Sequence, residues 1–374
     1  LHLMKHVDRS RFDLRMGLLN RSGPYVPQID PAHVMGPRIG ERFMDFERGN
    51  REAYQLTSLA PAVVLTPANV VAMLRDFEPH VVVSFRKGMS VIALAAVTLY
   101  GRSRLRFIAR EGNNTLAVIA DELASPLARR AVQELTARVY RAADRFLTIS
   151  YEMADELKTQ LALDPSRVRT IHNAVDLDEV ERRAAQPSDF DAGGPYVIAV
   201  GRLERQKGFD VLLRAFAASA HRRSHRLMLL GEGAHEQALR DLAGELGVAD
   251  RLLLPGWRDN PWALMRRADL FVLPSRWEGF GNVVIEAMAS RVPVVVSDCS
   301  YGPKEIVRHS QDGLVVPVED VAATTSAIDT LLGDRALAAR YVQSAAERAR
   351  DFGVPVIVKR YEALFLEAAR ELNA

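Results

Sequence analysis

Short apolar runs recur along this chain of 374 residues, and longer stretches with helical periodicity separate them. Apolar runs this short are typical of buried strands. Strands that alternate with helices predict parallel sheets flanked by helices, which is the α/β class. The strands are expected at residues 81–84, 106–109, 146–150, 168–171, 196–200, 227–230, 252–254, 270–273 and 292–297, with a further strand at 13–19.

The length of the chain indicates two such domains rather than one. Residues 176–194 interrupt the rhythm, being charged at first and then rich in Pro, Asp and Gly, which is typical of a linker. We therefore expect two Rossmann-like domains with a cleft between them, over residues 1–185 and 186–352. Residues 353–374 are expected to form a helix that crosses back to the first domain. Because an α/β domain normally opens with a strand, we also expect a strand to precede Leu1.

Composition excludes several classes of protein. The chain is 48% hydrophobic and 26% charged, which is ordinary for a soluble globular protein. Its longest apolar run, at residues 91–100, is too short to span a bilayer. Cys299 is the single cysteine, which excludes an internal disulfide framework and a cysteine-based zinc site. A lone cysteine fits a reducing compartment, so a cytoplasmic location is expected.

The charge of the chain is unevenly distributed. The net charge is only +2, but basic residues outnumber acidic ones over residues 1–150 and the reverse holds over 151–374. An arginine-rich half could contact an anionic membrane, such as the inner face of the cytoplasmic membrane, or a phosphate-bearing acceptor. Solvated helix faces explain the same arginines equally well. Nucleic acid is not expected as a partner, because basic and aromatic residues are not interleaved.

The stretch 274–289, PSRWEGFGNVVIEAMA, carries two carboxylates eight positions apart on either side of a Gly-Phe-Gly turn. It follows the expected strand at 270–273, and ligands of open α/β sheets bind beyond the carboxyl ends of such strands. Glu286, inside the helix that follows, can accept two hydrogen bonds from hydroxyl groups, as from a ribose. Glu278, in the loop, could meet a sugar. An isolated pair of glutamates would ordinarily be surface charge, but the chemistry of this loop favours a sugar-nucleotide site.

The backbone of the same turn suits an anion. Gly279 and Gly281 allow a ligand to approach the chain closely. Backbone N–H groups at the start of a helix attract phosphates. The expected donors are those of Phe280, Gly281, Asn282 and Val283.

The strand at 196–200 leads into a second candidate loop, GRLERQKG at residues 201–208. Gly201 allows a tight turn, Arg202 can bind a phosphate bidentately, and Lys207 adds a point charge. Such a cradle would stabilise the negative charge that develops on a departing nucleoside diphosphate. A basic surface loop is the alternative interpretation.

Two further strand ends carry turns that could line the same pocket. Gly231 follows the strand at 227–230, and Arg258 lies in the segment 255–260, which could surround a nucleotide base. The Asp-x-Asp patterns at 176–178 and 189–191 resemble metal-binding motifs, but we interpret them as solvated charges, so no metal is expected. The chain has no P-loop motif and no Gly-x-Ser-x-Gly elbow, which argues against a P-loop ATPase and a serine hydrolase.

Residues 201–208, 274–289 and 292–307 together resemble the retaining GT-B-fold glycosyltransferases of the glycosyl transferases group one family, of the bacterial surface-polysaccharide type. HNAVDLD at 172–178 agrees with the same resemblance. The resemblance implies that Arg202 and Lys207 hold the donor diphosphate and that Glu278 contacts the donor sugar as the third catalytic residue. It also implies that Glu286 binds the ribose, and that neither a metal nor a cofactor is needed.

The acceptor side departs from the family pattern. Many members have a histidine after the fourth strand of the first domain, whereas Arg110, Glu111 and Asn113 occupy that region here. One of these three would then face the reaction centre. Arg291 stands where the family has glycine after the helix, a position that favours a left-handed backbone.

The resemblance implies transfer of a hexose or N-acetylhexosamine, with retention, from a nucleotide diphosphate sugar to a carbohydrate or lipid-linked glycan in polysaccharide biosynthesis. The similarity of the loop SDCSYGPKEIV to bacterial surface-polysaccharide enzymes implies a UDP-sugar rather than a GDP-sugar. Two alternatives stay open: a non-catalytic nucleotide-sugar-binding protein and a GT-B sugar-nucleotide epimerase.

Overall fold

The computed structural model of the chain describes residues 1–19, 26–37, 56–85, 87–112 and 125–372. The chain divides into two compact units. Unit 1 comprises Leu1–Thr148, Ala154–Ile171 and Val358–Ala374. Unit 2 comprises Ile149–Met153 and His172–Ile357. Each unit is built on its own parallel sheet with flanking helices, so the expected α/β class with two Rossmann-like domains is confirmed.

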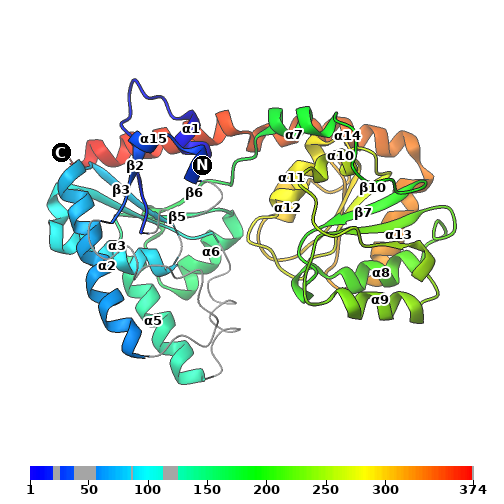
Figure 1. Cartoon of the computed structure of the whole chain (residues 1–374), viewed down its shortest axis with the longest axis horizontal. Helices are drawn as coiled ribbons and strands as arrows, with labels where there is room; N and C mark the ends of the chain where they lie inside the picture. Colours follow the sequence, from blue (N-terminus) through cyan, green and yellow to red (C-terminus); the bar gives the residue numbers. More distant parts are fainter. Residues whose placement is uncertain (20–25, 38–55, 86, 113–124, 373–374) are drawn as a thin grey trace. The chain divides into compact units, whose positions relative to one another are not determined.

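Unit 1 contains a four-stranded parallel sheet in the order β3-β4-β5-β6. Its strands are β3 (Val81–Phe85), β4 (Arg106–Arg110), β5 (Arg145–Thr148) and β6 (Val168–Thr170). The main helices beside it are α2 (Leu56–Phe77), α3 (Lys87–Tyr100), α5 (Pro126–Ala142) and α6 (Tyr151–Gln160). The apolar centre of β4 is fully buried between these layers. Figure 1 shows α2, α3 and α5 on one side of this sheet.

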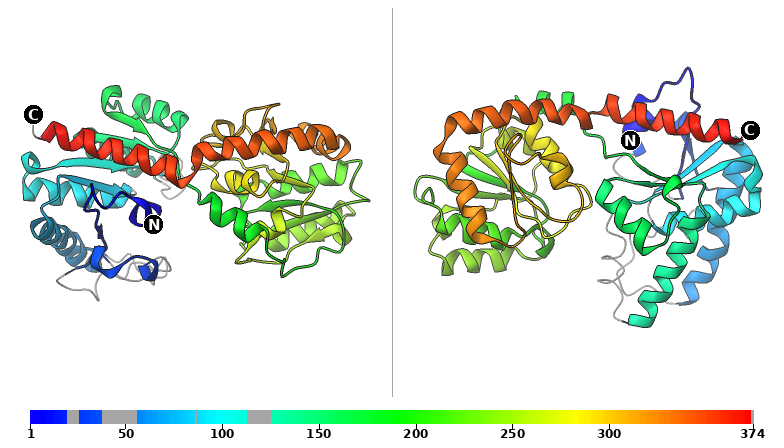
Figure 2. Two further views of the ribbon diagram at one scale, coloured as in Figure 1. Left: turned by 90° about the horizontal axis from the view of Figure 1, so that it is seen from above. Right: turned by 180° about the vertical axis from the view of Figure 1, so that it is seen from behind.

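The last helix, α15 (Val354–Leu372), begins in unit 2, and its residues from Val358 onward belong to unit 1. There it covers the face of the sheet opposite to α3 and α5 (Figure 2). Its polar side reaches the strands: Arg169 donates to Glu367 at 3.0 Å. Two short segments, β1 (Met16–Gly17) and β2 (Val34–Met35), pair in parallel. β1 lies inside the expected strand at 13–19, whereas β2 was not expected.

Unit 2 contains a six-stranded parallel sheet in the order β12-β11-β10-β7-β8-β9. Its strands are β7 (Tyr196–Val200), β8 (Arg226–Leu230), β9 (Leu252–Leu253), β10 (Leu270–Leu273), β11 (Val294–Ser297) and β12 (Leu314–Val316). Its main helices are α7 (Leu177–Ala184), α8 (Phe209–Ala218), α9 (Glu236–Glu245), α10 (Pro261–Met265), α11 (Asn282–Ala289), α12 (Pro303–Ile306), α13 (Val321–Gly333) and α14 (Arg335–Ala349). In Figure 1, α8, α9 and α13 cover one face of the sheet, and α10 and α11 cover the other.

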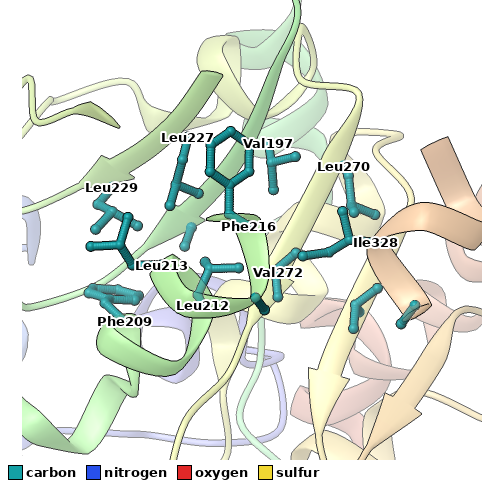
Figure 3. Packing of buried hydrophobic residues seen from close by; sticks show 14 of the residues in the cluster. Val197, Phe209, Leu212, Leu213, Phe216, Leu227, Leu229, Leu270, Val272 and Ile328 are labelled. Carbon is teal, nitrogen blue, oxygen red and sulfur yellow. The ribbon is translucent and has the colours of Figure 1, made fainter. Parts of the chain in front are cut away.

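The core of unit 2 lies between α8 and the central strands. Apolar residues recur along α8 every three or four positions, so they share one helix face. All four residues of β10 are buried, as expected for a strand covered on both faces. Figure 3 shows Phe209, Leu212, Leu213 and Phe216 of α8 packed against Val197, Leu227, Leu229, Leu270, Val272 and Ile328.

The segment expected to be a linker, 176–194, begins with the helix α7, so that expectation is wrong for residues 177–184. Asp176 is its N-cap, and the carboxylate accepts a hydrogen bond from the N–H of Glu179 at 3.0 Å. Acidic residues in the first turn and Arg182 and Arg183 in the last turn suit the helix dipole. The charges that resemble a linker therefore stabilise a helix. The units divide at residues 171 and 172, ahead of the boundary expected at 185.

Candidate active site

The carboxyl ends of β7 and β8 meet at two glycines. Gly231 has φ 143°, and a Cβ there would lie 2.1 Å from the carbonyl oxygen of Gly201. The N–H of Leu203 donates to the carbonyl of Glu232 at 2.8 Å, which joins the two loops directly. Only glycine permits this approach of two backbones. Gly201 and Gly231, two of the predicted donor-site glycines, thus determine how the loops at the carboxyl end of the sheet pack.

The loop after β7 also contacts the loop after β10. Lys207 ends a 3-10 helix (Arg205–Lys207), and Gly208 follows with φ 64°. A Cβ on Gly208 would lie 2.1 Å from the carbonyl oxygen of Pro274. The close approach of these backbones places Lys207 beside the segment that carries Glu278.

Lys207 and Glu278 form a buried ion pair. The Lys207 Nζ lies 2.6 Å from the Glu278 Oε1, and the two side chains are 14% and 7% exposed. The Ser275 hydroxyl donates to the same oxygen at 2.6 Å. Both donors reach Oε1, so among the described residues none donates a side-chain hydrogen bond to the second oxygen of Glu278. The two charges of this buried ion pair offset each other.

Arg202 lies outside this pair. Its side chain is 69% exposed, and it donates to Glu204 at 3.0 Å. The structure therefore brings two of the three predicted catalytic residues together and leaves the third at the rim, where its long side chain can turn toward an anion.

The predicted anion-binding turn opens α11. Gly281 is its N-cap, with φ 91°, and no side chain caps the helix there. Phe280 is buried and stacks on His172, with ring centroids 5.0 Å apart. Asn173 donates to the side-chain oxygen of Asn282 at 3.1 Å. His172 and Asn173 thus hold the turn in place. This is the turn whose N–H groups, from Phe280 to Val283, are predicted to bind an anion.

Glu286 lies within α11 and is held by α10. The Trp262 indole donates to the Glu286 Oε2 at 3.0 Å. Burial raises the pKa of the Glu286 carboxyl above its usual range, and the hydrogen bond from Trp262 partly offsets that rise. The indole thereby orients one of the two carboxylate oxygens of Glu286.

Arg258, predicted to line the base pocket, faces the segment before β7. It pairs with Asp189 at 3.4 Å, and its guanidinium lies over the Phe190 ring, 5.5 Å from the ring centroid. The second Asp-x-Asp pattern therefore provides a partner for Arg258 in addition to its solvated charge.

The acceptor-side candidates lie in unit 1. Glu111 is buried, and its two oxygens accept hydrogen bonds from the Tyr140 hydroxyl at 2.6 Å and from the N–H of Gly112 at 2.8 Å. Arg110 donates to the Tyr361 hydroxyl at 2.9 Å. Asn113 lies outside the described residues. The contacts of Glu111 are those of a side chain that holds the end of β4 in place.

Several residues of the site have little sequence signal of their own. Trp262 reaches Glu286 and His172 reaches Phe280 from separate elements, so these contacts depend on packing. Ser275 lies three positions before Glu278 in the same loop. The one sequence signal for Trp262 is its indole N–H, a hydrogen-bond donor in the first turn of α10. In the part of the chain that the structure describes, no helix combines the length and the apolarity needed to cross a bilayer.

Two family models together match most of the chain. Residues 180–348 match the model described as Glycosyl transferases group 1, and residues 32–179 match the model described as Glycosyltransferase Family 4. The range 180–348 lies within unit 2 and contains the Lys207–Glu278 pair and Glu286. The range 32–179 lies mostly in unit 1.

Two curated relatives match about half of the chain. The N-acetylgalactosamine-N,N'-diacetylbacillosaminyl-diphospho-undecaprenol 4-alpha-N-acetylgalactosaminyltransferase of Campylobacter jejuni is 30% identical over 218 residues, 58% of this chain and 59% of that protein. The lipopolysaccharide core biosynthesis glycosyltransferase LpsE of Rhizobium meliloti is 33% identical over 180 residues, 48% of this chain and 52% of that protein. The chain thus spans between half and two thirds of the length of these relatives.

A solved structure shares the fold. HepE of Anabaena, crystallised in complex with UDP and glucose, superposes with a TM-score of 0.72 at 19% identity and covers 93% of this chain and 90% of its own. The expected GT-B architecture is therefore confirmed.

Proposed function

Since this chain belongs to the GT-B glycosyltransferases, with residues 180–348 in the glycosyl transferases group 1 family, we propose that it transfers a hexose or N-acetylhexosamine from a nucleotide diphosphate sugar to a glycan. A lipid-linked glycan in polysaccharide biosynthesis is the proposed acceptor. The support is that the Campylobacter relative is named for a diphospho-undecaprenol-linked acceptor and that LpsE is named for lipopolysaccharide core biosynthesis.

The observation that carries the proposal is the Lys207–Glu278 pair, 2.6 Å apart at the carboxyl ends of β7 and β10. A donor combines an anionic diphosphate with a hydroxyl-rich sugar. Lys207 supplies positive charge for the diphosphate, and the open oxygen of Glu278 accepts a hydrogen bond from a sugar hydroxyl. Arg202 reaches in from the rim and stabilises the charge that grows on the leaving diphosphate.

The rest of the donor is assigned to α11 and its neighbours. The free oxygen of Glu286 accepts a hydrogen bond from a ribose hydroxyl while Trp262 holds the other oxygen. The N–H groups from Phe280 to Val283 bind phosphate oxygens. UDP is favoured over GDP as the nucleotide, which the UDP complex of the structurally similar HepE supports.

We also propose that transfer needs no metal or cofactor and retains the configuration of the anomeric carbon. Lys207 and Arg202 take over the electrostatic role that a divalent ion has in metal-dependent enzymes. Attack from the face of the leaving group, assisted by the departing phosphate, accounts for retention. Addition of EDTA should leave the rate unchanged, and proton NMR of the new linkage should show the anomer of the donor.

A cytoplasmic location with peripheral attachment to an anionic membrane completes the proposal. Its support is the exposed arginines of α5, at Arg130, Arg138 and Arg141. The protein should float with vesicles of phosphatidylglycerol and phosphatidylcholine at low salt, and much less with phosphatidylcholine alone.

The decisive experiment is a panel of nucleotide sugars, scored first by binding and then by turnover. UDP-glucose, UDP-galactose, their N-acetyl forms and GDP-mannose are each tested by thermal shift, because a ligand at a hundred times its dissociation constant adds about 2.7 kcal/mol of stability. Release of nucleoside diphosphate that requires an undecaprenyl-linked glycan establishes transfer. Binding without release would favour the non-catalytic protein, and conversion of the donor without acceptor would favour the epimerase.

A further inference from the structure

Arg276 joins the two loops that carry Lys207 and Glu278. Its guanidinium makes a bidentate contact with Asp210, with Nη1 at 2.9 Å from Oδ1 and Nη2 at 2.8 Å from Oδ2. The Arg276 side chain is only 12% exposed. Asp210 stands in the first turn of α8, directly after the loop of Lys207, while Arg276 precedes Glu278 by two positions. Parallel bonds of this kind fix both distance and orientation.

Hydrogen bonds to the backbone join the same two loops. The N–H of Arg276 donates to the carbonyl of Gln206 at 2.8 Å, and the Gln206 side chain donates to the carbonyl of Trp277 at 2.9 Å. The Arg276 Nη1 also donates to the carbonyl of Arg205 at 2.8 Å. These bonds involve the residues directly before Lys207 and directly before Glu278, so a shift of one loop against the other must break several of them together.

A third loop reaches the same guanidinium. The Arg276 Nε donates to Glu319 at 2.7 Å, and Glu319, after β12, has φ 62°. A glutamate in the left-handed region is uncommon, and here this backbone presents a carboxylate to Arg276. The hydrogen bond with Asp210 raises the pKa of Arg276. Burial alone would raise the pKa of Asp210, but the hydrogen bond and charge of Arg276, with backbone hydrogen bonds, together outweigh burial and hold that pKa below its usual value. The loops after β7, β10 and β12 thus converge on one side chain.

We propose that Arg276 is a positioning residue of the donor site, which holds Lys207 and Glu278 at the spacing that a bound nucleotide diphosphate sugar requires. The inference rests on the proposed function, because it assumes that these two residues bind the donor. Arg276 itself touches no part of the donor in this assignment. It acts through the loop of Lys207, so its loss weakens donor binding and turnover only while Lys207 is present.

The test compares Arg276→Lys with a matched control, Arg308→Lys. Arg308 also makes a bidentate contact, with the fully buried Asp312 at 2.7 and 2.8 Å, but that pair precedes β12 at the amino end of the sheet. Lysine cannot reproduce either bidentate contact, so each variant loses one, although the Arg308 side chain is 48% exposed and that of Arg276 is 12% exposed. Each is measured for melting temperature, for the dissociation constant of UDP by calorimetry, and for donor turnover per folded molecule.

Arg276→Lys should weaken UDP binding about 10-fold and lower kcat about 10- to 100-fold, because small displacements of binding groups cost this much. Arg308→Lys should lower the melting temperature, while the dissociation constant of UDP and kcat stay within about twofold of wild type. In a Lys207→Gln background, Arg276→Lys should weaken UDP binding by less than about twofold, because its effect passes through Lys207.

Two results separate this inference from the proposed function. If the wild-type protein binds neither UDP nor GDP, the proposed function fails and the role of Arg276 fails with it. If the wild type binds UDP but Arg276→Lys and Arg308→Lys weaken binding alike, or if Arg276→Lys retains its full effect without Lys207, only the positioning role is overturned.

Discussion

The Lys207 ammonium and the Glu278 carboxylate are 2.6 Å apart, although 71 positions separate them in the chain, and both side chains are largely buried. Each charge therefore depends on the other, since a buried charge without a partner is costly. A diphosphate that reaches Lys207 offers the ammonium a second anionic partner. When Lys207 turns from Glu278 to the diphosphate, the Glu278 carboxylate loses its ion-pair partner and can accept a hydrogen bond from the donor. Donor binding is therefore coupled to the breaking of this ion pair.

The first prediction follows from this exchange. Glu278→Gln keeps the shape of the side chain and an oxygen for Ser275 but removes the charge that competes for Lys207. UDP should therefore bind at least as tightly as to wild type, while transfer falls about 100-fold or more because the sugar contact is weakened. Calorimetry with UDP and a diphosphate-release assay measure the two effects. Normal transfer by the variant would remove Glu278 from the catalytic residues.

The second prediction concerns stability. Lys207→Met leaves the Glu278 charge buried and unpaired, which should lower the free energy of unfolding of unit 2 by about 3–5 kcal/mol. Adding Glu278→Gln should restore most of the loss, because no charge then remains unpaired. All three tryptophans of the chain lie in unit 2, so their fluorescence during urea unfolding reports this unit. Additive losses in the double variant would contradict the coupling.

Local patterns were enough to predict five of the six strands of the second unit and its glycine turns. β7, β8 and β10 follow from short apolar runs, and the glycine at the start of α11 follows from its turn. Contacts between distant elements were not predictable in the same way. The partner of Glu278 is 71 positions away, and that of Glu286 is Trp262, so both pairs depend on how loops pack across the sheet. These contacts arise only once the strand order is known.

Two elements of unit 2, α7 and β12, differ from the sequence prediction for local reasons. The sequence of α7 predicts a linker because its charged residues resemble solvated charge. The same residues, acidic at the start and basic at the end, suit a helix dipole. β12 was not predicted because it is only three residues long and follows a polar turn. Its place at the edge of the sheet follows from pairing with β11 rather than from its own composition.

The third prediction concerns Glu286 and pH. Because burial raises its pKa, the carboxyl takes up a proton at a higher pH in the folded protein than in the unfolded chain. Its contribution to stability is therefore fully present below the ordinary pKa of glutamate and is lost as pH rises through the raised value. Ligand binding runs the other way, because the protonated carboxyl accepts fewer hydrogen bonds from the ribose. UDP affinity should fall as pH drops through this raised pKa.

Trp262→Phe tests the same group. Loss of the indole donor removes an interaction that lowers the pKa of Glu286, so the fall in affinity should begin at a higher pH than in wild type. The phosphate of UDP also titrates, with a pKa of about 6. Glu286→Gln is the control, since whatever pH dependence it retains belongs to the ligand. Identical profiles for wild type and Glu286→Gln would contradict a role for this carboxylate.

The fourth prediction compares two glycines of unit 2. Gly231→Ala adds a Cβ 2.1 Å from the carbonyl oxygen of Gly201 at φ 143°, which should cost about 2–4 kcal/mol and weaken UDP binding. Gly244, near the end of α9, has nothing within 4 Å of an added Cβ. Gly244→Ala should therefore stabilise the protein by about 0.5–1 kcal/mol, through helix propensity, with UDP binding unchanged. Equal stability of the two variants would contradict the close backbone approach.

The fifth prediction concerns Arg291, which follows α11 with φ 65°. The left-handed conformation costs a residue with a side chain about 1 kcal/mol, and glycine adopts it freely. Arg291 pairs only loosely with Glu181, at 3.5 Å and with both side chains about half exposed, so the pair contributes little. Arg291→Gly should therefore raise the free energy of unfolding by about 0.5–1 kcal/mol in urea, with an unchanged slope. Glu181→Gln isolates the ion pair. If Arg291→Gly destabilises the protein as much as or more than Glu181→Gln does, the strain at this position is smaller than its backbone angle implies.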